Sequence, residues 1–363
     1  MLQFIPLALI AIVLFSWCID YINGFHDTAN AIATVVSTGV MPAKYAIVMA
    51  ATLNFAGALM GTSVATTIAK GLADSSQMVP AVIIAALLAA ILWDLLTWWF
   101  GIPSSTSHTL MGGLAGAVIA HAGVTALKWA KLREIGAFIV ISPALGFLVA
   151  AILIISILWI VRRMRVRKVN FAFRKLQLLS AAAMAFTHGQ NDAQKAMGVI
   201  CLGLITYGFL PPWVGNVPVP LWVKVGSALM MGAGTAGGGM KIIKTLGHKI
   251  TKLRPIHGFA AESAAAIVLF TTAHFGIPVS TTHSISGAIM GVGTSMNASA
   301  VRWGLAGNIF MAWLLTIPVS ALLAMGFYKA IVIVAPSLNV NPRSAQIQVV
   351  NPSKAPARAI SRP

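Results

Sequence analysis

Acidic side chains are scarce in this sequence. Only seven of its 363 residues are Asp or Glu, and charged residues of all kinds make up 9% of the chain, against about 25% in an average soluble domain. The 25 Lys and Arg are an ordinary content, so the net charge of +18 arises because carboxylates are missing. A basic surface built to bind nucleic acid is therefore not indicated. Hydrophobic residues make up 58% of the chain and the mean hydropathy is +0.87, which excludes a soluble globular protein.

Cysteine is nearly absent as well. Cys18 and Cys201 both lie in apolar runs, so we interpret them as core residues that give no indication of the redox compartment. No Lys or Arg precedes Lys44, although a secretory signal peptide needs a basic region before its apolar core. The apolar run 2–22 is therefore predicted to be a retained first membrane helix.

Apolar runs long enough for membrane segments recur along almost the whole chain. A membrane helix needs about 20 such residues. Short segments at 106–120 and 281–292 are rich in Gly, Ser and Thr and follow prolines, which is typical of half-helices or re-entrant hairpins that line a cavity. The fold class predicted is an all-α integral membrane protein with about 10–12 membrane segments, hairpins included. The longer runs are 2–22, 45–69, 79–100, 135–161, 176–187, 199–210, 220–233, 259–275 and 303–334.

Two dense basic clusters interrupt this apolar pattern. Seven Lys and Arg lie between 162 and 175, and five lie between 241 and 254. Because cytoplasmic loops are enriched in Lys and Arg, both clusters are predicted to face the cytoplasm. The C-terminal end is rich in Pro, Ser and Asn and is predicted to be disordered. The predicted organisation is a first membrane half at 1–161, a basic cytoplasmic loop at 162–175, a second membrane half at 176–335 and a disordered tail at 336–363.

The strongest signal is an internal repeat. Gly101-Ile-Pro-Ser-Ser-Thr-Ser-His108 and Gly276-Ile-Pro-Val-Ser-Thr-Thr-His283 agree at six of eight positions. A second pair lies upstream, where Gly24-Phe-His-Asp-Thr-Ala-Asn30 corresponds to Gly189-Gln-Asn-Asp-Ala-Gln-Lys195. Duplicated halves with interrupted hydrophobic segments at matching positions indicate a secondary transporter whose site lies near the bilayer midplane. The repeat by itself does not distinguish parallel from inverted halves.

The Gly-Ile-Pro motif of each half predicts a helix start rich in hydroxyl groups. Gly and Pro end the preceding helix, and Pro also suits the first turn of a new one. Backbone N–H groups, hydroxyl donors and the positive end of the helix dipole then point the same way, which makes an anion site. The alternative is that the hydroxyls only cap helices and that Gly112 and Gly116 allow close packing. The candidate anion-binding residues are Ser105, Thr106, Ser107, Ser280, Thr281 and Thr282.

Two histidines follow these hydroxyls at matching positions. His108 and His283 are expected to orient a hydroxyl, to donate to the anion or to carry a coupling proton. The alternative is that each is a hydrogen-bonded packing residue of the membrane interior.

The aspartate motifs predict a cation site. Asp27 and Asn30 are three residues apart and share one helical face. Carboxylate and amide oxygens suit a hard cation such as Na⁺, whereas a buried carboxyl group can instead carry H⁺. In the second half, Asn191 adds an amide beside Asp192. Lys195 has the same spacing from Asp192, so it is expected either to pair with that carboxylate or to bring positive charge to the anion.

The remaining acids are assigned by their neighbours. Glu262 lies among Ala and Ser and is predicted to face a cavity or a partner helix. Asp94 lies among tryptophans typical of an interfacial belt, so it is predicted to snorkel to the interface. Asp20, Asp74 and Glu134 are likewise predicted to be interfacial or to lie in loops.

In these motifs the sequence resembles the inorganic phosphate transporter (PiT) family. The runs Asn23–Ala31, His188–Lys195 and Lys241–Ile250 and the Gly-Ile-Pro pair are similar to family segments, most of all in its bacterial low-affinity branch. The likeness extends from about Tyr21 to Val334. The resemblance implies an all-helical symporter with two inverted-topology repeats, a homodimer in the bacterial inner membrane, that imports inorganic phosphate with H⁺ or Na⁺.

The resemblance also implies roles for single residues. It places the paired aspartates of the family on Asp27 and Asp192, an intramembrane glutamate on Glu262, and hairpin hydroxyls on Ser105, Thr106, Ser280 and Thr281. His26 and Lys195 stand where many relatives have Asn, and Asn54 stands where animal relatives carry Glu. These changes remove oxygen ligands or add charge, which favours H⁺ over Na⁺. Phosphate carried as a neutral metal complex is a further option. The resemblance implies no resident metal site beyond the option of Na⁺ at Asp27 and Asp192.

Two other functions stay open at this point. One is a permease for sulfate or another oxyanion. The family that the sequence resembles has a sulfate-carrying relative, so the resemblance does not fix the anion. The other, more distant, is an intramembrane hydrolase that uses Ser, His and Asp. An enzyme needs one such set, whereas this chain duplicates every motif, so no enzyme activity and no cofactor beyond the coupling ion are expected.

Overall fold

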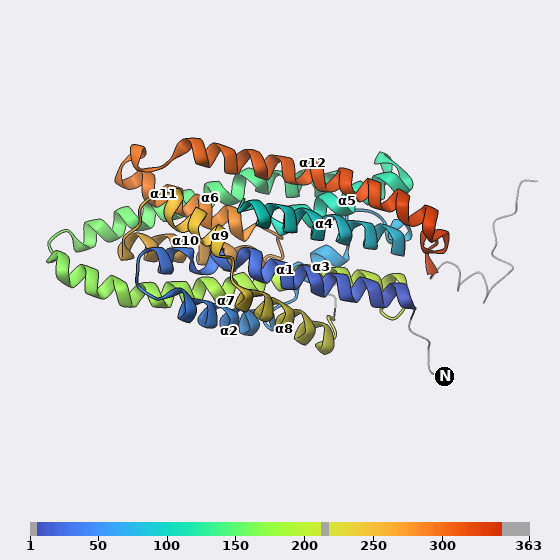
Figure 1. Cartoon of the computed structure of the whole chain (residues 1–363), viewed down its shortest axis with the longest axis horizontal. Helices are drawn as coiled ribbons and strands as arrows, with labels where there is room; N and C mark the ends of the chain where they lie inside the picture. Colours follow the sequence, from blue (N-terminus) through green and yellow to red (C-terminus); the bar gives the residue numbers. More distant parts are fainter. Residues whose placement is uncertain (1–5, 212–217, 343–363) are drawn as a thin grey trace, which may run out of the picture.

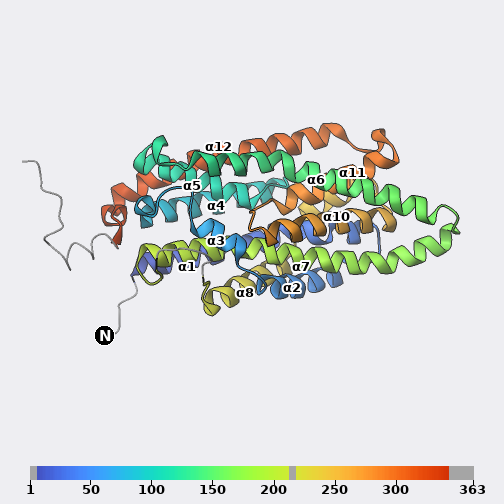
Figure 2. The ribbon, with the colours of Figure 1, turned by 180° about the vertical axis from the view of Figure 1, so that it is seen from behind.

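The computed structural model describes residues 6–211 and 218–342. Within these ranges there are twelve α-helices, joined in places by short 3-10 or π-helical turns, and no β-strand. The helices run lengthwise side by side (Figure 1, Figure 2). The predicted all-α class is confirmed. The helices are α1 (Leu7–Ser37), α2 (Ala43–Ala58), α3 (Ser63–Ala69), α4 (Pro80–Phe100), α5 (Thr106–Ala122), α6 (Trp129–Val161), α7 (Val166–Thr206), α8 (Leu221–Gly237), α9 (Met240–Lys244), α10 (Pro255–His274), α11 (Thr281–Met296) and α12 (Trp303–Val334).

Two long helices, α1 and α7, carry the aspartate motifs in their interior. The sequence predicted that the first span ends at residue 22, but α1 continues through Asp27 to Ser37. The two predicted segments 176–187 and 199–210 are likewise one 41-residue helix that passes through Asp192. Both predictions were wrong because polar residues were taken as breaks. These polar residues are buried against other helices, so the helix continues through them.

The helix breaks occur at glycine instead. Gly101 after α4 and Gly276 after α10 have φ angles of 66° and 68°, a left-handed conformation that residues with a Cβ rarely adopt. The chain reverses at both points, so α4–α5 and α10–α11 form the two predicted hairpins. The predicted run 45–69 is split into α2 and α3, which meet at an angle of 67°. In the described part of the chain, five helices are long and apolar enough to span a membrane, or six if α2 and α3 count as one span.

The two halves of the chain pack through matching helix pairs. Helix α5 lies against α12 as α11 lies against α6, and α1 packs on α8 as α7 packs on α2. The two hairpins occupy opposite halves of the long axis (Figure 1). Their turns touch, since Ser107 Oγ donates to the Val279 carbonyl oxygen at 3.1 Å. The duplicated motifs of both halves are thereby brought to one place.

Glycines allow these helices to approach at backbone distance. A Cβ atom added to Gly116 of α5 would collide with the backbone of Ala321 on α12, and one added to Gly291 of α11 would collide with the backbone of Phe147 on α6. Gly112 lies against α12 in the same way. The close packing expected at Gly112 and Gly116 is therefore present, and it recurs in the second half.

The basic segment 162–175 is mostly helical and not a loop. Helix α6 ends at Val161 and α7 begins at Val166, so the cluster forms the tip of a helical hairpin. This tip extends past the other helices at one end of the bundle (Figure 1, Figure 2). Of the predicted tail, Pro336–Asn339 forms a single 3-10 turn, and residues 343–363 lie outside the described residues.

Candidate functional site

The two aspartate motifs meet inside the bundle. Asp27 on α1 and Asp192 on α7 are both buried, with 2% and 0% exposure. One carboxylate oxygen of each and one ring nitrogen of His188 all lie within 4.8 Å of one another. Helices α1 and α7 pack together and contact α4 and α10, which brings the two hairpin turns to the same point. Residues from both halves therefore build one cluster.

The Asp192 carboxylate is surrounded by four polar side chains. Its Oδ1 atom is 2.8 Å from the ammonium group of Lys195, and its Oδ2 atom accepts hydrogen bonds from Asn23 Nδ2 at 3.1 Å and Thr281 Oγ1 at 3.3 Å. His188 Nε2 lies 3.7 Å from the same Oδ2. A buried ion pair needs such additional hydrogen bonds to offset the loss of hydration. Of the two roles expected for Lys195, pairing with Asp192 is the one seen here.

Lys195 also faces the first hairpin. Its Nζ atom lies 3.5 Å from Thr106 Oγ1 at the start of α5, and Thr106 in turn donates to Asn23 Oδ1 at 3.1 Å. The ammonium group therefore stands between a carboxylate and a hydroxyl at a helix N-terminus. In the described part of the chain it is the only buried Lys or Arg.

Asp27 is surrounded by different chemistry. Its Oδ1 atom is 2.6 Å from His26 Nδ1, and its Oδ2 atom accepts a hydrogen bond from Thr282 Oγ1 at 3.5 Å. The other ring nitrogen of His26 lies 3.1 Å from Thr97 Oγ1. Asp27 is thus held by an imidazole and a hydroxyl, where Asp192 is held by an ammonium group.

Each aspartate motif also reaches the hairpin of the opposite half. Asn30 Nδ2 donates to Thr281 Oγ1 at 3.2 Å and to Thr282 Oγ1 at 2.9 Å, while Lys195 approaches Thr106. This crossed arrangement explains why the duplicated motifs form a single site. The predicted residues that come together here are Asp27, Asn30, Asp192, Lys195, Thr106, Thr281 and Thr282.

The serines of the turns have structural contacts. Ser105 Oγ accepts the backbone N–H of His108 at 3.3 Å, and Ser280 Oγ accepts that of His283 at 3.2 Å. Both serines are therefore N-caps of the following helices, and Ser107 joins the two turns as described above. The capping alternative fits Ser105 and Ser280. Beside them, Thr281 contacts the Asp192 carboxylate, and Thr106 contacts Asn23 and Lys195.

His108 and His283 contact each other rather than the carboxylates. Their ring centroids are 4.9 Å apart, and His283 stacks on Trp313 at 3.9 Å. Trp313 Nε1 donates to the Pro103 carbonyl oxygen at 2.9 Å and so fixes the stack below the first turn. Among the described residues no hydrogen bond joins either imidazole to a hydroxyl group, so the geometry is that of packing residues.

Glu262 and Asn191 lie beside the cluster without joining it. Asn191 Nδ2 donates to the Leu269 carbonyl oxygen at 2.8 Å. Glu262 on α10 faces helices α1 and α7. Of the two surroundings predicted for it, a cavity or a partner helix, the structure shows the second. Its carboxylate accepts hydrogen bonds from Thr34, Gln177 and Ser180.

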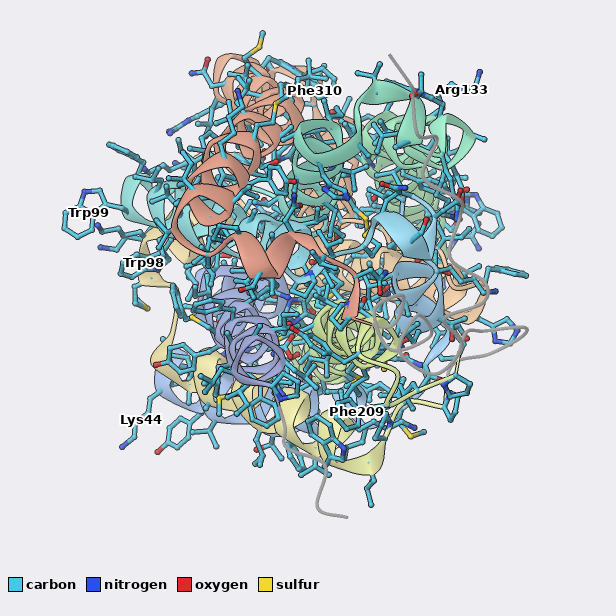
Figure 3. The ribbon with its side chains drawn as sticks, turned by 90° about the vertical axis from the view of Figure 1, so that its right-hand side faces the viewer. Lys44, Trp98, Trp99, Arg133, Phe209 and Phe310 are labelled. Atoms are coloured by element: carbon cyan, nitrogen blue, oxygen red, sulfur yellow. The ribbon has the colours of Figure 1, made fainter. Side chains whose placement is uncertain are left out.

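Two acids that were predicted to lie at the interface are buried, and that prediction was wrong. Asp94 is 0% exposed and accepts a hydrogen bond from Thr109 Oγ1 at 2.9 Å, because this face of α4 packs on α5. Trp99, on another face of α4, projects away from the bundle (Figure 3). Asp20 is 1% exposed and lies two helical turns before Asp27 on the same face of α1. That seven-residue spacing was the available signal.

Several neighbours of the carboxylates were not predicted as site residues. Asn23 and His188 occupy matching positions of the two motifs, four residues before each aspartate. The alignment of the halves was therefore sufficient to find them. Asn54, whose Oδ1 lies 3.0 Å from His188 Nδ1, comes from α2, which carries no duplicated motif, so the repeat gave no signal for it. Thr97 and Thr272 lie four residues before Gly101 and Gly276, so the alignment of the hairpins could have found Thr97.

The buried charges are strongly unbalanced. Five of the seven acids are buried, whereas Asp74 and Glu134 lie at the surface as predicted. In the described ranges a single buried lysine opposes these five carboxyl groups. Burying an unpaired charge costs several kcal/mol. The excess of buried carboxyl groups therefore favours the binding of protons or cations in the interior.

Comparison with known proteins identifies a family and several relatives. The model of the phosphate transporter family matches residues 23–170 and 161–324, and each range contains one aspartate motif and one Gly-Ile-Pro motif. A probable low-affinity inorganic phosphate transporter of Rhizobium meliloti (strain 1021) is 46% identical over 328 residues, which cover 90% of this chain and 96% of the relative. One of Bacillus subtilis (strain 168) is 45% identical over 316 residues, covering 86% and 94%.

A solved structure shares the fold. The chain superposes on a structure described as the sodium-dependent phosphate transporter with a TM-score of 0.81 and 24% sequence identity, over 90% of this chain and all of that one.

Proposed function

Because the chain belongs to the phosphate transporter family, we propose that it is a secondary active symporter that imports inorganic phosphate together with protons across the cell membrane. The relatives are named as phosphate transporters, and the helices are those of a multi-pass membrane protein. The coupling ion and the roles of single residues belong to this proposal.

One observation carries the proposal: a buried ion pair stands at the meeting point of two hydroxyl-lined helix starts. The Asp192–Lys195 pair lies within hydrogen-bonding range of Thr106 from one hairpin and Thr281 from the other. The helix N-termini and the ammonium group are the donors that an oxyanion needs. The two carboxylates beside them are the acceptors that a coupling cation needs.

This arrangement supports a simple means of coupling. While Asp192 is ionised, it holds the Lys195 ammonium group at 2.8 Å, and an entering phosphate would have to compete for that group. A proton bound by Asp192 removes the negative charge and releases Lys195 toward the phosphate. Deprotonation on the other side restores the pair and weakens the hold on the anion. Proton and phosphate thereby move together.

Electrostatics requires a coupling cation of some kind. Against an inside-negative potential, each negative charge that enters is opposed by about 2.3 kcal/mol per 100 mV. We propose protons and not Na⁺, because nitrogen groups already occupy the space beside both carboxylates. His26 stands at Asp27, and Lys195 and His188 stand at Asp192. A Na⁺ ion prefers oxygen ligands and is repelled by an ammonium group.

The test is uptake of radiolabelled phosphate by proteoliposomes under imposed gradients. We expect an acid-outside pH gradient to drive accumulation in the absence of Na⁺, and collapse of the gradient by a protonophore to abolish it. Uptake that responds to a Na⁺ gradient alone would identify Na⁺, and not the proton, as the coupling ion. Uptake that responds to neither gradient would refute symport. Dependence on Mg²⁺ or Ca²⁺ would indicate a neutral metal-phosphate complex as the substrate.

Two competing functions are weaker. Competition by sulfate in the same assay would favour a general oxyanion permease. A hydrolase would need a serine hydroxyl hydrogen-bonded to an imidazole, but Ser105 and Ser280 accept backbone N–H groups instead. Ser104 Oγ does lie 3.4 Å from His26 Nε2, but the same nitrogen is closer to Thr97 Oγ1, at 3.1 Å. Ester hydrolysis that is lost in Ser280→Ala, with flux unchanged, would revive that reading.

We also infer that the halves are inverted repeats. The exchanged packing partners and the placement of the hairpins in opposite halves of the long axis support this relation (Figure 2). The homodimer implied by the resemblance stays a prediction, which the mass of the detergent-solubilised protein tests.

A further inference from the structure

A second polar region lies at the end of the bundle, apart from the carboxylate cluster. A cavity of about 610 Å³ opens between the tip of the α6–α7 hairpin and the start of α10. Its walls are mainly apolar, but Arg162 at the end of α6 and Arg254 before α10 both line it. The apolar lining includes Leu158, Val161, Met164, Val169, Leu253 and Ile256.

The cavity lies where the apolar surface of α6 gives way to charge. With 33 residues, α6 is about 50 Å long, whereas the hydrocarbon core is about 30 Å thick. Near its end, Trp159 and Ile160 are 64% and 68% exposed, as expected of a surface that faces lipid. Arg162 lies two residues after Ile160, and its guanidinium group is 4.5 Å from the centroid of the Trp159 ring. A tryptophan followed by arginines is typical of the headgroup level of a membrane.

The charges around the cavity have one sign. None of the described residues that line it is acidic, and the hairpin tip carries further exposed bases at Arg163, Arg165 and Arg167. By contrast, the cavity of about 470 Å³ beside Leu9 and Trp222 has only apolar lining residues among those described. A pair of arginines combined with apolar walls therefore distinguishes the hairpin cavity from this one.

We propose that this cavity binds one anionic phospholipid of the cytoplasmic leaflet. Its phosphate lies between Arg162 and Arg254, and an acyl chain follows the apolar face of Leu158 and Val161. A guanidinium group matches a phosphodiester in charge and in hydrogen-bonding geometry. Basic pockets between membrane helices on the cytoplasmic side are suited to such headgroups. The apolar walls distinguish a lipid from a free anion.

The test compares two double variants of equal charge. Arg162→Gln with Arg254→Gln removes both cavity arginines, whereas Arg163→Gln with Arg167→Gln removes two exposed bases of the same hairpin that do not line the cavity. Each protein is reconstituted in phosphatidylcholine with a minor fraction of phosphatidylglycerol. Native mass spectrometry then counts the lipids that stay bound after detergent extraction. All four positions are exposed, so both variants are expected to fold.

We expect the wild type and the control variant to retain one phosphatidylglycerol in preference to phosphatidylcholine. The cavity variant should lose that preference by about tenfold or more. Equal loss in both variants would mean diffuse attraction to the basic hairpin and would overturn the proposal, as would equal retention. Displacement of the lipid by millimolar inorganic phosphate would identify a free-anion site instead and would also overturn it.

Discussion

The two halves of this molecule share a backbone plan but differ in the charge of their aspartate motifs. When the motifs are aligned, His26 corresponds to Asn191 and Asn30 corresponds to Lys195. When the hairpins are aligned, Asp94 corresponds to Leu269. The first half therefore has two acids and an imidazole near its turn. The second half has one acid, an ammonium group and, at the position of Asn23, the imidazole of His188.

The contacts of the aligned positions show what this difference does. Asn191 donates to the backbone of Leu269 on α10, whereas His26 lies next to Asp27 and reaches Thr97 on α4. The same helix-to-helix link is thus neutral in one half and titratable in the other. Duplication supplied the scaffold, and divergence at a few positions separated an acidic side from a cationic side.

The largest effect is expected from the acid of the second half. Asp192→Asn removes the charge that holds Lys195, so proton-driven phosphate accumulation should fall at least about tenfold, because one coupled charge is worth about 2.3 kcal/mol per 100 mV. Exchange of internal for external phosphate should persist, since the asparagine resembles the protonated acid. Proteoliposome uptake and counterflow measure the two quantities. Asp74→Asn, at a surface position, is the matched control.

Loss of exchange together with accumulation would contradict the release of Lys195, because it would mean that binding itself had failed. Near-normal accumulation would remove Asp192 from the coupling site.

The acid of the first half should matter to a similar extent and through the same site. Asp27→Asn is expected to reduce coupled uptake about tenfold, because it removes the partner of His26 and Thr282. The double variant with Asp192→Asn should be much less than additive, since groups of one site act as a unit. A double-mutant cycle on uptake measures the coupling. Strict additivity would mean that the two halves work independently and do not form one site.

The sequence predicted the hairpins and the paired motifs but not the depth of every acid. Gly101 and Gly276 marked the turns because glycine readily adopts the left-handed backbone conformation that ends a helix, and this preference depends only on the local sequence. Asp94 was misplaced because its tryptophan neighbours were taken to indicate an interface, whereas the burial of its side chain is decided by α5, which the local sequence does not contain. In the same way, α1 was ended too early because the polar residues after Ile22 are buried by α7 and α8. Tertiary packing, and not local hydropathy, fixes these positions.

A smaller effect is expected when the second half is made to resemble the first. Lys195→Asn leaves Asp192 without its cation, and a buried unpaired carboxylate is costly. Added Na⁺ should then bind near Asp192 and raise the melting temperature of the variant by a few degrees, about as expected for 1 kcal/mol or less. Thermal unfolding in detergent, with choline in place of Na⁺ as reference, measures the shift. Lys44→Asn is the control, because Lys44 projects outward from the molecule (Figure 3).

If Na⁺ stabilises the wild type as much as the variant, the ammonium group does not exclude the cation and the charge difference between the halves has no bearing on ion choice. If it stabilises neither, Asp192 takes a proton in the absence of Lys195.

The smallest effect is expected where the halves are alike. Ser105→Ala and Ser280→Ala each remove one N-cap, so each should lower the free energy of unfolding by about 1 kcal/mol. The KM for phosphate should change by less than about twofold, because these hydroxyls accept backbone N–H groups and do not face the carboxylates. Thr281→Val, one position later, should raise the KM more, since that hydroxyl contacts Asp192 and Asn30. Denaturant unfolding and uptake kinetics separate the two roles. A serine variant that raises the KM as strongly as Thr281→Val would return the serines to the anion site and make capping secondary in both halves.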